Sequence, residues 1–148
     1  MSRLIRPAPR LTTDDAHMWD LLSTGRLHLQ RCTGCAHVRF PPGPVCPTCR
    51  GDRAEWLAVS GRGGVLSWVV FRRQYFEGIE PPHVVVAGEL AEGPIVLADF
   101  DGDPSVLALD LPIEVVVAPA EFEDGITRPL YRWRASSDAP TITPRRSG

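Results

Sequence analysis

Two cysteine pairs carry the clearest chemistry in this sequence. Cys32 and Cys35 form one C-x-x-C pair, Cys46 and Cys49 form another, and ten residues separate the two pairs. A two-residue gap lets one turn present both thiolates to a cation, and two such turns complete a tetrahedral site. Four soft thiolates favour zinc, and a full set of four protein ligands leaves no position for a substrate or a nucleophilic water. The spacing therefore predicts a structural zinc site.

Two other uses of the cysteines remain open. An iron site of the rubredoxin kind is the stronger alternative, because the run Cys46-Pro47-Thr48-Cys49 is typical of such proteins. Disulfides are the weaker alternative. The first residues contain arginine and proline where a signal peptide needs an apolar run, which predicts a cytoplasmic protein whose thiols stay reduced. No segment reaches the ~18 apolar residues of a membrane helix, so we expect no membrane contact.

A second group of residues has the composition of a nucleotide site. Arg72 and Arg73 are adjacent, and Tyr75 and Phe76 follow closely. Guanidinium groups bind phosphate through paired hydrogen bonds, and aromatic rings can stack on an adenine. The alternative is a solvated arginine pair beside aromatic side chains that close the end of a barrel.

Composition removes several kinds of catalysis. The chain has 148 residues, and lysine is absent from it, so no lysine can form a Schiff base or act as a general base. Asparagine is absent too, which excludes N-glycosylation and triads that contain asparagine. The net charge of −2 is uneven: residues 1–62 carry nine arginines and five acids, and residues 63–148 carry seven arginines and thirteen acids. This asymmetry indicates two modules.

The first module has to position the cysteines. Residues 1–11 show no periodicity, so we expect a flexible arm. Thr12 precedes an acidic turn and a helical apolar stripe, which predicts a short helix over residues 14–23 that ends at Gly25.

Strands are expected on both sides of the cysteine segment. Alternation over residues 27–32 predicts a strand into the first pair, and residues 54–60 read as a strand leaving the second. The segment between is rich in glycine and proline and too poor in apolar residues to form a core, so metal binding has to stabilise it. Residues 12–62 are thus predicted to form a helix and a rubredoxin-like zinc ribbon.

The second module reads as all-β. Five runs of β-branched and aromatic residues, separated by Gly, Pro and Asp turns, predict strands over residues 64–72, 83–91, 94–100, 113–118 and 129–135. Five short strands without a long helix predict a small OB-fold barrel over residues 63–135. Residues 136–148 are polar and are expected to be a disordered tail. The fold class is therefore mainly β.

Two details of the barrel follow from the alternation of side chains. In the first barrel strand, apolar residues occupy both faces from Val65 to Phe71, so we expect both faces to be covered. Trp133 lies between Arg132 and Arg134, which predicts an exposed edge position.

The sequence resembles the DUF35 family, proteins that join a rubredoxin-like zinc ribbon to an OB-fold and accompany thiolase-type and acyl-CoA enzymes. Short motifs in a specific order, over roughly residues 17–133, carry the resemblance. They are Trp19, Gly25-Arg26-Leu27, Arg31-Cys32-x-x-Cys35, Phe40-Pro41-Pro42, Cys46-Pro47-x-Cys49, Glu55-Trp56, Ser60-Gly61-Arg62-Gly63, Val65–Val70, Glu92-Gly93-Pro94, Pro112–Val116 and Pro129-Leu130-Tyr131. One departure is Pro82-His83, where the family often has Pro-Tyr.

The resemblance implies a function and partners. Such proteins look like non-catalytic partners of thiolases, of lipid-transfer-type aldolases and of MaoC-type hydratases, and they act with steroid, polyketide or fatty acyl-CoA intermediates. We therefore expect an accessory subunit in a hetero-oligomer, with Arg72, Arg73, Tyr75 and Phe76 as candidates for contact with CoA. The composition agrees, because the cysteines are used by the metal and no histidine stands in an obvious nucleophile or carboxylate motif.

Two functions of other classes remain as alternatives. A zinc ribbon on an OB-fold could bind single-stranded nucleic acid, but a barrel half that sums to −6 lacks the basic groove that phosphates need. An iron site would instead make the chain a rubredoxin-like electron carrier.

Overall fold

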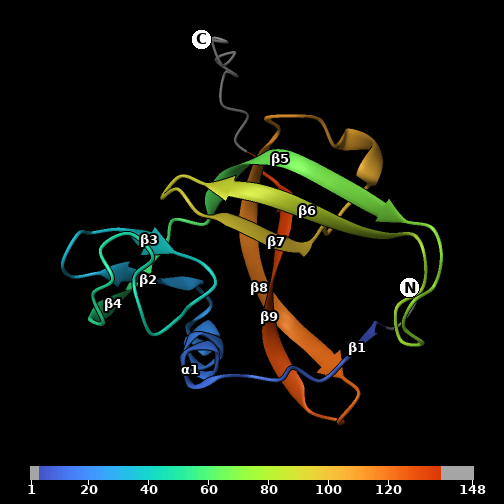
Figure 1. Ribbon diagram of the computed structural model, residues 1–148. Coiled ribbons are helices and arrows are strands. Elements are labelled where there is room, and N and C mark those ends of the chain that lie inside the picture. The colour runs from blue at the N-terminus through green and yellow to red at the C-terminus, as the bar shows by residue number, and fades with distance from the viewer. Residues whose placement is uncertain (1–3, 138–148) are drawn as a thin grey trace.

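The computed structural model describes residues 4–137, which form a ribbon module and a curled β-sheet (Figure 1). The predicted tail lies, from residue 138 onward, outside the described residues. The elements, in chain order, are β1 (Ile5–Arg6), α1 (Thr13–Leu21), a 3-10 turn (Leu22–Thr24), β2 (His28–Cys32), β3 (Val38–Arg39), β4 (Ala54–Ala58), β5 (Arg62–Phe71), β6 (His83–Leu90), β7 (Ile95–Asp99), a 3-10 turn (Pro104–Val106), β8 (Pro112–Phe122) and β9 (Thr127–Ala135). The mainly β prediction is confirmed.

Helix α1 begins as its sequence predicts. The hydroxyl of Thr12 accepts a hydrogen bond from the Asp15 amide, and the Asp15 carboxylate accepts one from the Thr12 amide, which is a complete capping box. The following 3-10 turn ends at Gly25, whose φ of 82° is a left-handed conformation that glycine adopts without strain.

The ribbon module is a three-stranded sheet in the order β3-β2-β4. β2 pairs antiparallel with β4 over five residues and with β3 over two. β3 lies in the segment that the sequence indicated to be a loop. It forms because the chain between the two cysteine pairs folds back along β2.

The barrel sheet runs in the order β1-β8-β5-β6-β7, and β9 pairs with the other side of β8. All five predicted barrel strands are present, as β5 to β9. A bridge between Phe100 and Trp133 joins the end of β7 to β9 and curls the sheet. In Figure 1 the long strands β8 and β9 cross behind β5, β6 and β7.

The expectation of a flexible arm over residues 1–11 is wrong for β1. Ile5 and Arg6 pair in parallel with Glu121 and Phe122 at the end of β8. The Ile5 amide also donates a 2.8 Å hydrogen bond to the Gly78 carbonyl. Only the folded barrel brings these partners together, so the local sequence carries no signal for the strand.

The prediction of two covered faces on β5 is also wrong. A bulge between Val65 and Ser67 shifts the alternation by one residue. Val65 is buried and Trp68 packs against the same core, whereas Val69 is 51% and Phe71 is 38% exposed. The outer face of β5 is therefore apolar and open.

Trp133 is fully buried, which corrects the prediction of an edge position. Its indole Nε1 donates a 3.0 Å hydrogen bond to the Val96 carbonyl, so the ring fills the barrel and its polar atom is satisfied. The flanking arginines alternate to the other side of the strand. Gly88 makes this packing possible, because a Cβ on it would lie 2.8 Å from the Ile113 Cδ1 and closer still to the Trp133 ring.

One hydrophobic core joins the two modules. Met18, Leu22 and Leu29 from the first module belong to the same buried cluster as Val86 and Trp133 of the barrel. Aromatic contacts extend this junction, with ring centroids 5.8 Å apart for Trp19 and Phe122 and 6.3 Å apart for Phe40 and Tyr131. Burial, together with the nearby charges of Asp15 and Asp99, raises the pKa of Tyr131 to about 12.

Replacing Gly88 with alanine tests the packing of Trp133. We expect a loss of about 1–3 kcal/mol in the free energy of unfolding, because the new methyl group overpacks the core. Denaturant unfolding measures the loss. Gly43→Ala is the matched control, since a Cβ there meets no atom within 4 Å, and it should unfold like the parent chain. Equal stability of both variants would contradict the packing.

Candidate functional site

The four cysteines converge at the tip of the ribbon. Cys32 ends β2, and the other three lie in the turns that follow β2 and β3. The Sγ atoms of Cys32 and Cys49 are 3.4 Å apart, those of Cys35 and Cys46 are 3.7 Å apart, and all four lie within 4.8 Å of one another. Ligands at ~2.3 Å from a tetrahedral zinc are about 3.8 Å apart. The described residues therefore place four thiols at the spacing of a tetrahedral metal site.

The two turns that present the thiols are built alike. In the first, the Ala36 amide donates to the Cys32 carbonyl; in the second, the Arg50 amide donates to the Cys46 carbonyl, both at 2.9 Å. Ala36 and Arg50 each have a positive φ, of 66° and 62°. A second bond at 2.9 Å closes each turn, from the Cys32 amide to the His37 carbonyl and from the Cys46 amide to the Gly51 carbonyl. Equivalent turns give each pair the same orientation toward a shared ion.

The four thiols cannot all be ionised at neutral pH without a cation between them. Hydrogen bonds from the backbone at Cys49 and Thr48 lower the pKa of Cys46 to about 6 despite its burial. The backbone at His37 favours the Cys35 thiolate, but burial and the three neighbouring thiols outweigh it and raise the pKa of Cys35 to about 12. A divalent ion removes this conflict, because it stabilises all four thiolates together.

The thiol group lies at the edge of the protein interior. Cys32 and Cys46 are buried, and Cys35 and Cys49 lie on the surface. A Cβ on Gly51 would lie 3.3 Å from the Cys49 sulfur, so the turn leaves little room beside the thiols. With four sulfur ligands and no open position, the donor set fits an ion that holds the fold.

The second predicted group lies in the loop between β5 and β6, at the same end of the barrel as β1 (Figure 1). The Arg73 guanidinium lies 5.9 Å from the Tyr75 ring centroid, and the Tyr75 ring meets Phe71 edge-on at 5.8 Å. Tyr75 is 67% and Phe76 is 53% exposed, so neither ring closes the barrel end.

This loop borders a cavity of about 250 Å³, lined by Phe71, Arg73, Tyr75, Phe76, Ile79 and His83. Three of the four predicted residues therefore share one cavity. Arg72 is adjacent in the chain but is not among the lining residues. We refer to this space as the aromatic cavity.

The structure pairs a histidine with a carboxylate that the sequence did not connect. His83 Nε2 lies 2.8 Å from Asp99 Oδ1, and Arg6 forms an ion pair with the same carboxylate. The three residues come from β6, β7 and β1, so strand pairing alone brings them together and no motif could have revealed them.

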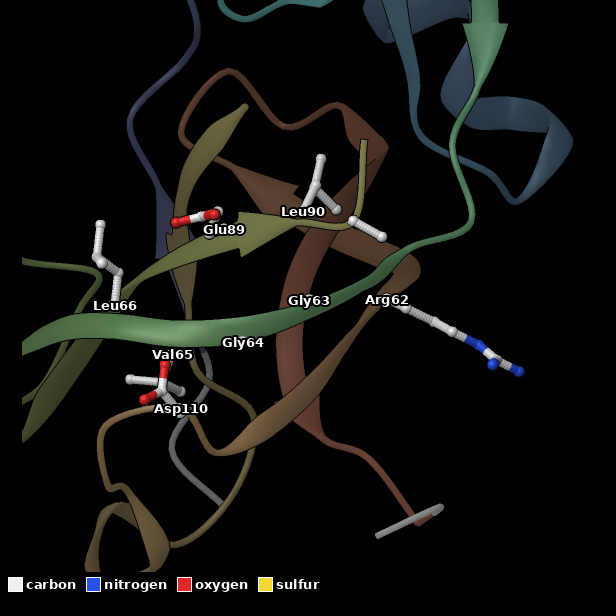
Figure 2. Close-up of a pocket in the computed structure, with 9 residues that line it drawn as sticks. Arg62, Gly63, Gly64, Val65, Leu66, Glu89, Leu90 and Asp110 are labelled. Atoms are coloured by element: carbon white, nitrogen blue, oxygen red, sulfur yellow. The ribbon is translucent and has the colours of Figure 1, made fainter. Parts of the chain in front are cut away.

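A further pocket, of about 330 Å³, lies along the glycines of β5. Gly63 and Gly64 form a bare stretch of strand, with Leu66 and Glu89 on one side and Asp110 on the other (Figure 2). The Arg62 side chain extends away from these residues. None of the predicted site residues lines this pocket.

Three arginines of the barrel sheet are neutralised by acidic side chains. Arg6, Arg128 and Arg134 are each paired with a carboxylate. Phosphate tracking needs unpaired basic side chains along a groove. Among residues 4–137, no helix is long and apolar enough to cross a membrane.

Comparison with known proteins assigns both modules. Residues 19–55 match the model of the ChsH2 rubredoxin-like zinc ribbon domain, and residues 56–118 match that of the ChsH2 C-terminal OB-fold domain.

Three curated relatives cover most of the chain. A probable enoyl-CoA hydratase alpha subunit of Thermomonospora curvata is 31% identical over 131 residues, which are 88% of this chain and 40% of that protein. A DUF35 domain-containing scaffold protein of Pyrococcus furiosus is 32% identical over 106 residues, 66% of this chain and 75% of that one. Benzoylsuccinyl-CoA thiolase subunit BbsA of Thauera aromatica is 27% identical over 107 residues, 70% of this chain and 72% of that one. The chain spans about two fifths of the hydratase subunit's length.

A solved structure agrees with these relatives. A chain in the structure titled "Ltp2-ChsH2(DUF35) aldolase" superposes with a TM-score of 0.74 at 30% identity, covering 86% of this chain and 98% of that one. On the family models, the identities and this shared fold, the chain belongs to the DUF35 family.

Proposed function

We propose that this chain is a non-catalytic accessory subunit of an acyl-CoA enzyme. Its partner would be a thiolase-like enzyme, a lipid-transfer-type aldolase or a MaoC-type hydratase, and it would help to present acyl-CoA intermediates of steroid, polyketide or fatty acyl metabolism. The observation that carries the proposal is the match to nearly the whole DUF35 chain of an aldolase structure. Relatives named as a hydratase subunit, a thiolase subunit and a scaffold protein support the same class of partner.

A role without catalysis is supported by the chemistry of the described residues. All four cysteines belong to the metal group, and the chain contains no lysine. The aromatic cavity contains a histidine, but no cysteine, serine or threonine lines it. The lining of this cavity therefore offers His83 no hydroxyl or thiol nucleophile to activate.

The metal proposed for the cysteine group is zinc. Four thiolates in a closed tetrahedral set suit it, and it has no redox chemistry of its own. Iron in the same site would make the chain an electron carrier. We place the protein in the cytoplasm, because the site needs reduced thiols.

The loop after β5 is proposed to contact CoA. Arg72 and Arg73 would bind phosphates, and Tyr75 and Phe76 would stack on the ring. Both rings are largely exposed and are thus available to a ligand. Neither arginine forms an ion pair within the described part of the chain.

The metal proposal predicts one zinc per chain and a colourless protein. Cys46→Ser should lose the ion and lower the melting temperature by about 10 °C, the shift that a loss of about 3 kcal/mol produces in a chain of this size. Elemental analysis and calorimetry measure both effects. His37→Ala, beside the first turn but outside the thiol set, should keep the ion. A red protein with ferric absorption would favour the electron carrier instead.

The accessory role predicts assembly without independent turnover. The full chain, co-expressed with thiolase-like, aldolase or hydratase proteins of its own organism, should co-purify with one of them in a fixed ratio. The isolated chain should leave acyl-CoA substrates unchanged in a mass-spectrometric assay. Turnover by the isolated chain that His83→Ala abolishes would show an enzyme and overturn the proposal.

The CoA proposal predicts weaker binding when the loop loses its charge. Arg72→Gln together with Arg73→Gln should reduce CoA affinity by about tenfold in low-salt calorimetry, since two charge-assisted hydrogen bonds are lost. Arg134→Gln is the control, because this arginine is already paired with Glu114. An equal loss in both variants would indicate only a general charge effect.

A further inference from the structure

The aromatic cavity has walls for one flat ring system. Phe71, Tyr75, Phe76 and the imidazole of His83 surround it, and Ile79 adds an aliphatic side chain. Phe71 stacks on His83 with an interplanar angle of 25°. A volume of about 250 Å³ lies just below the ~300–1,000 Å³ of pockets for drug-sized ligands. The cavity therefore suits a single ring system and excludes a whole cofactor.

The hydrogen bond to Asp99 fixes which nitrogen of a neutral His83 ring carries the proton. A carboxylate can only accept, so Nε2 of His83 is the donor in the 2.8 Å contact. Arg6 holds the other oxygen of Asp99 and balances its charge. In a neutral imidazole with its proton on Nε2, Nδ1 is an acceptor. Among residues 4–137 no hydrogen bond reaches Nδ1, so it is the ring atom left for a ligand.

The barrel topology holds this arrangement at the rim of the cavity. His83 begins β6 opposite Phe71 of β5, and Asp99 ends β7 opposite Val85. Phe71, His83, Val85 and Asp99 thus share the outer face of the sheet at one end of the barrel. Arg6 reaches the same point from β1, so three strands fix the histidine.

Charge and hydrogen bonding together select the ligand. Arg73 lies against Tyr75 and has no carboxylate partner among the described residues, so it favours an anionic group at the rim. Nδ1 can accept a hydrogen bond from a ring that enters the cavity. A purely apolar acyl group would offer Nδ1 no donor, and hypoxanthine would oppose it with a carbonyl oxygen at position 6.

We propose that the aromatic cavity is an adenine subsite in which His83, oriented by Asp99, accepts a hydrogen bond from the 6-amino group of an adenosine phosphate. This deepens the proposed function, on which it rests for identifying the nucleotide as the head of CoA. His83 is the specificity-determining residue, and Asp99 is a positioning residue that acts through it.

The test compares ADP with IDP, which differ in the group at position 6. The full chain is titrated with each and followed by the amide NMR shifts of residues 71–83. ADP should bind about tenfold more tightly than IDP, because the oxygen at position 6 of IDP cannot donate a hydrogen bond to Nδ1. His83→Phe keeps a flat ring but no acceptor, so the two affinities should become equal. His17→Phe, at a histidine that stacks on Trp56 away from this loop, should keep the preference.

Asp99→Asn gives a readout that a purely structural role would not produce. Arg6 should hold the amide oxygen, so the amide nitrogen would donate to His83 Nε2 and move the ring proton to Nδ1. Nδ1 then becomes a donor, and the preference should reverse toward IDP. Weaker binding of both nucleotides with an unchanged ratio would overturn the positioning role.

Equal binding of ADP and IDP by the parent chain overturns the adenine subsite, whatever the variants do. CoA, dephospho-CoA and phosphopantetheine identify the source of the nucleotide. CoA binding more tightly than ADP supports the CoA head group. If ADP binds more tightly than IDP but CoA binds no more tightly than ADP, the adenine subsite stands and the proposed CoA contact is contradicted. If the chain assembles with an acyl-CoA enzyme but does not distinguish ADP from IDP, the accessory role stands and the adenine subsite is overturned.

Discussion

Four sulfur atoms within 4.8 Å of one another set the strongest constraint on this protein. Such a group can be fully ionised at neutral pH only around a cation, because neighbouring thiols suppress each other's ionisation. The segment that carries them contains two short turns and a two-residue strand, with few apolar side chains to bury. A metal ion held by these thiols would replace a hydrophobic core at this end of the molecule. It would also fix the end of β2, where Cys32 lies.

The two modules are not independent bodies joined by a hinge. Leu27 and Leu29 of the ribbon lie in the same buried cluster as Val86 and Trp133 of the barrel. β1, which precedes the helix, pairs with the far end of β8 and bonds to the loop after β5. The N-terminal segment is thus tied to the barrel sheet before the ribbon begins. A partner that contacts the ribbon would meet a surface whose position relative to the barrel is fixed.

The end of the barrel that carries the aromatic cavity combines features that local stability does not explain. The rings of Tyr75 and Phe76 are exposed, and Arg73 has no carboxylate partner within residues 4–137, so these side chains gain little from their positions. A mostly buried Arg–Asp–His group stands directly beside them. Large apolar side chains exposed together usually mark a site of contact with a ligand or a partner. This end is therefore where we propose that an acyl-CoA ligand contacts the chain.

Sequence alone determined the features that depend on short spacing. The two C-x-x-C pairs predicted the four thiols that the fold brings together, the capping box at Thr12 and Asp15 defined the start of α1, and the turn residues separated five barrel strands. Tertiary structure decided what depends on distant partners. β1 exists because β8 offers an edge, the bulge near Val65 turned Val69 outward, and Trp133 is buried because Gly88 leaves room for its ring. The contact between His83 and Asp99 belongs to the same class, because cross-strand register, which no local pattern encodes, brings residues 16 positions apart into one hydrogen bond.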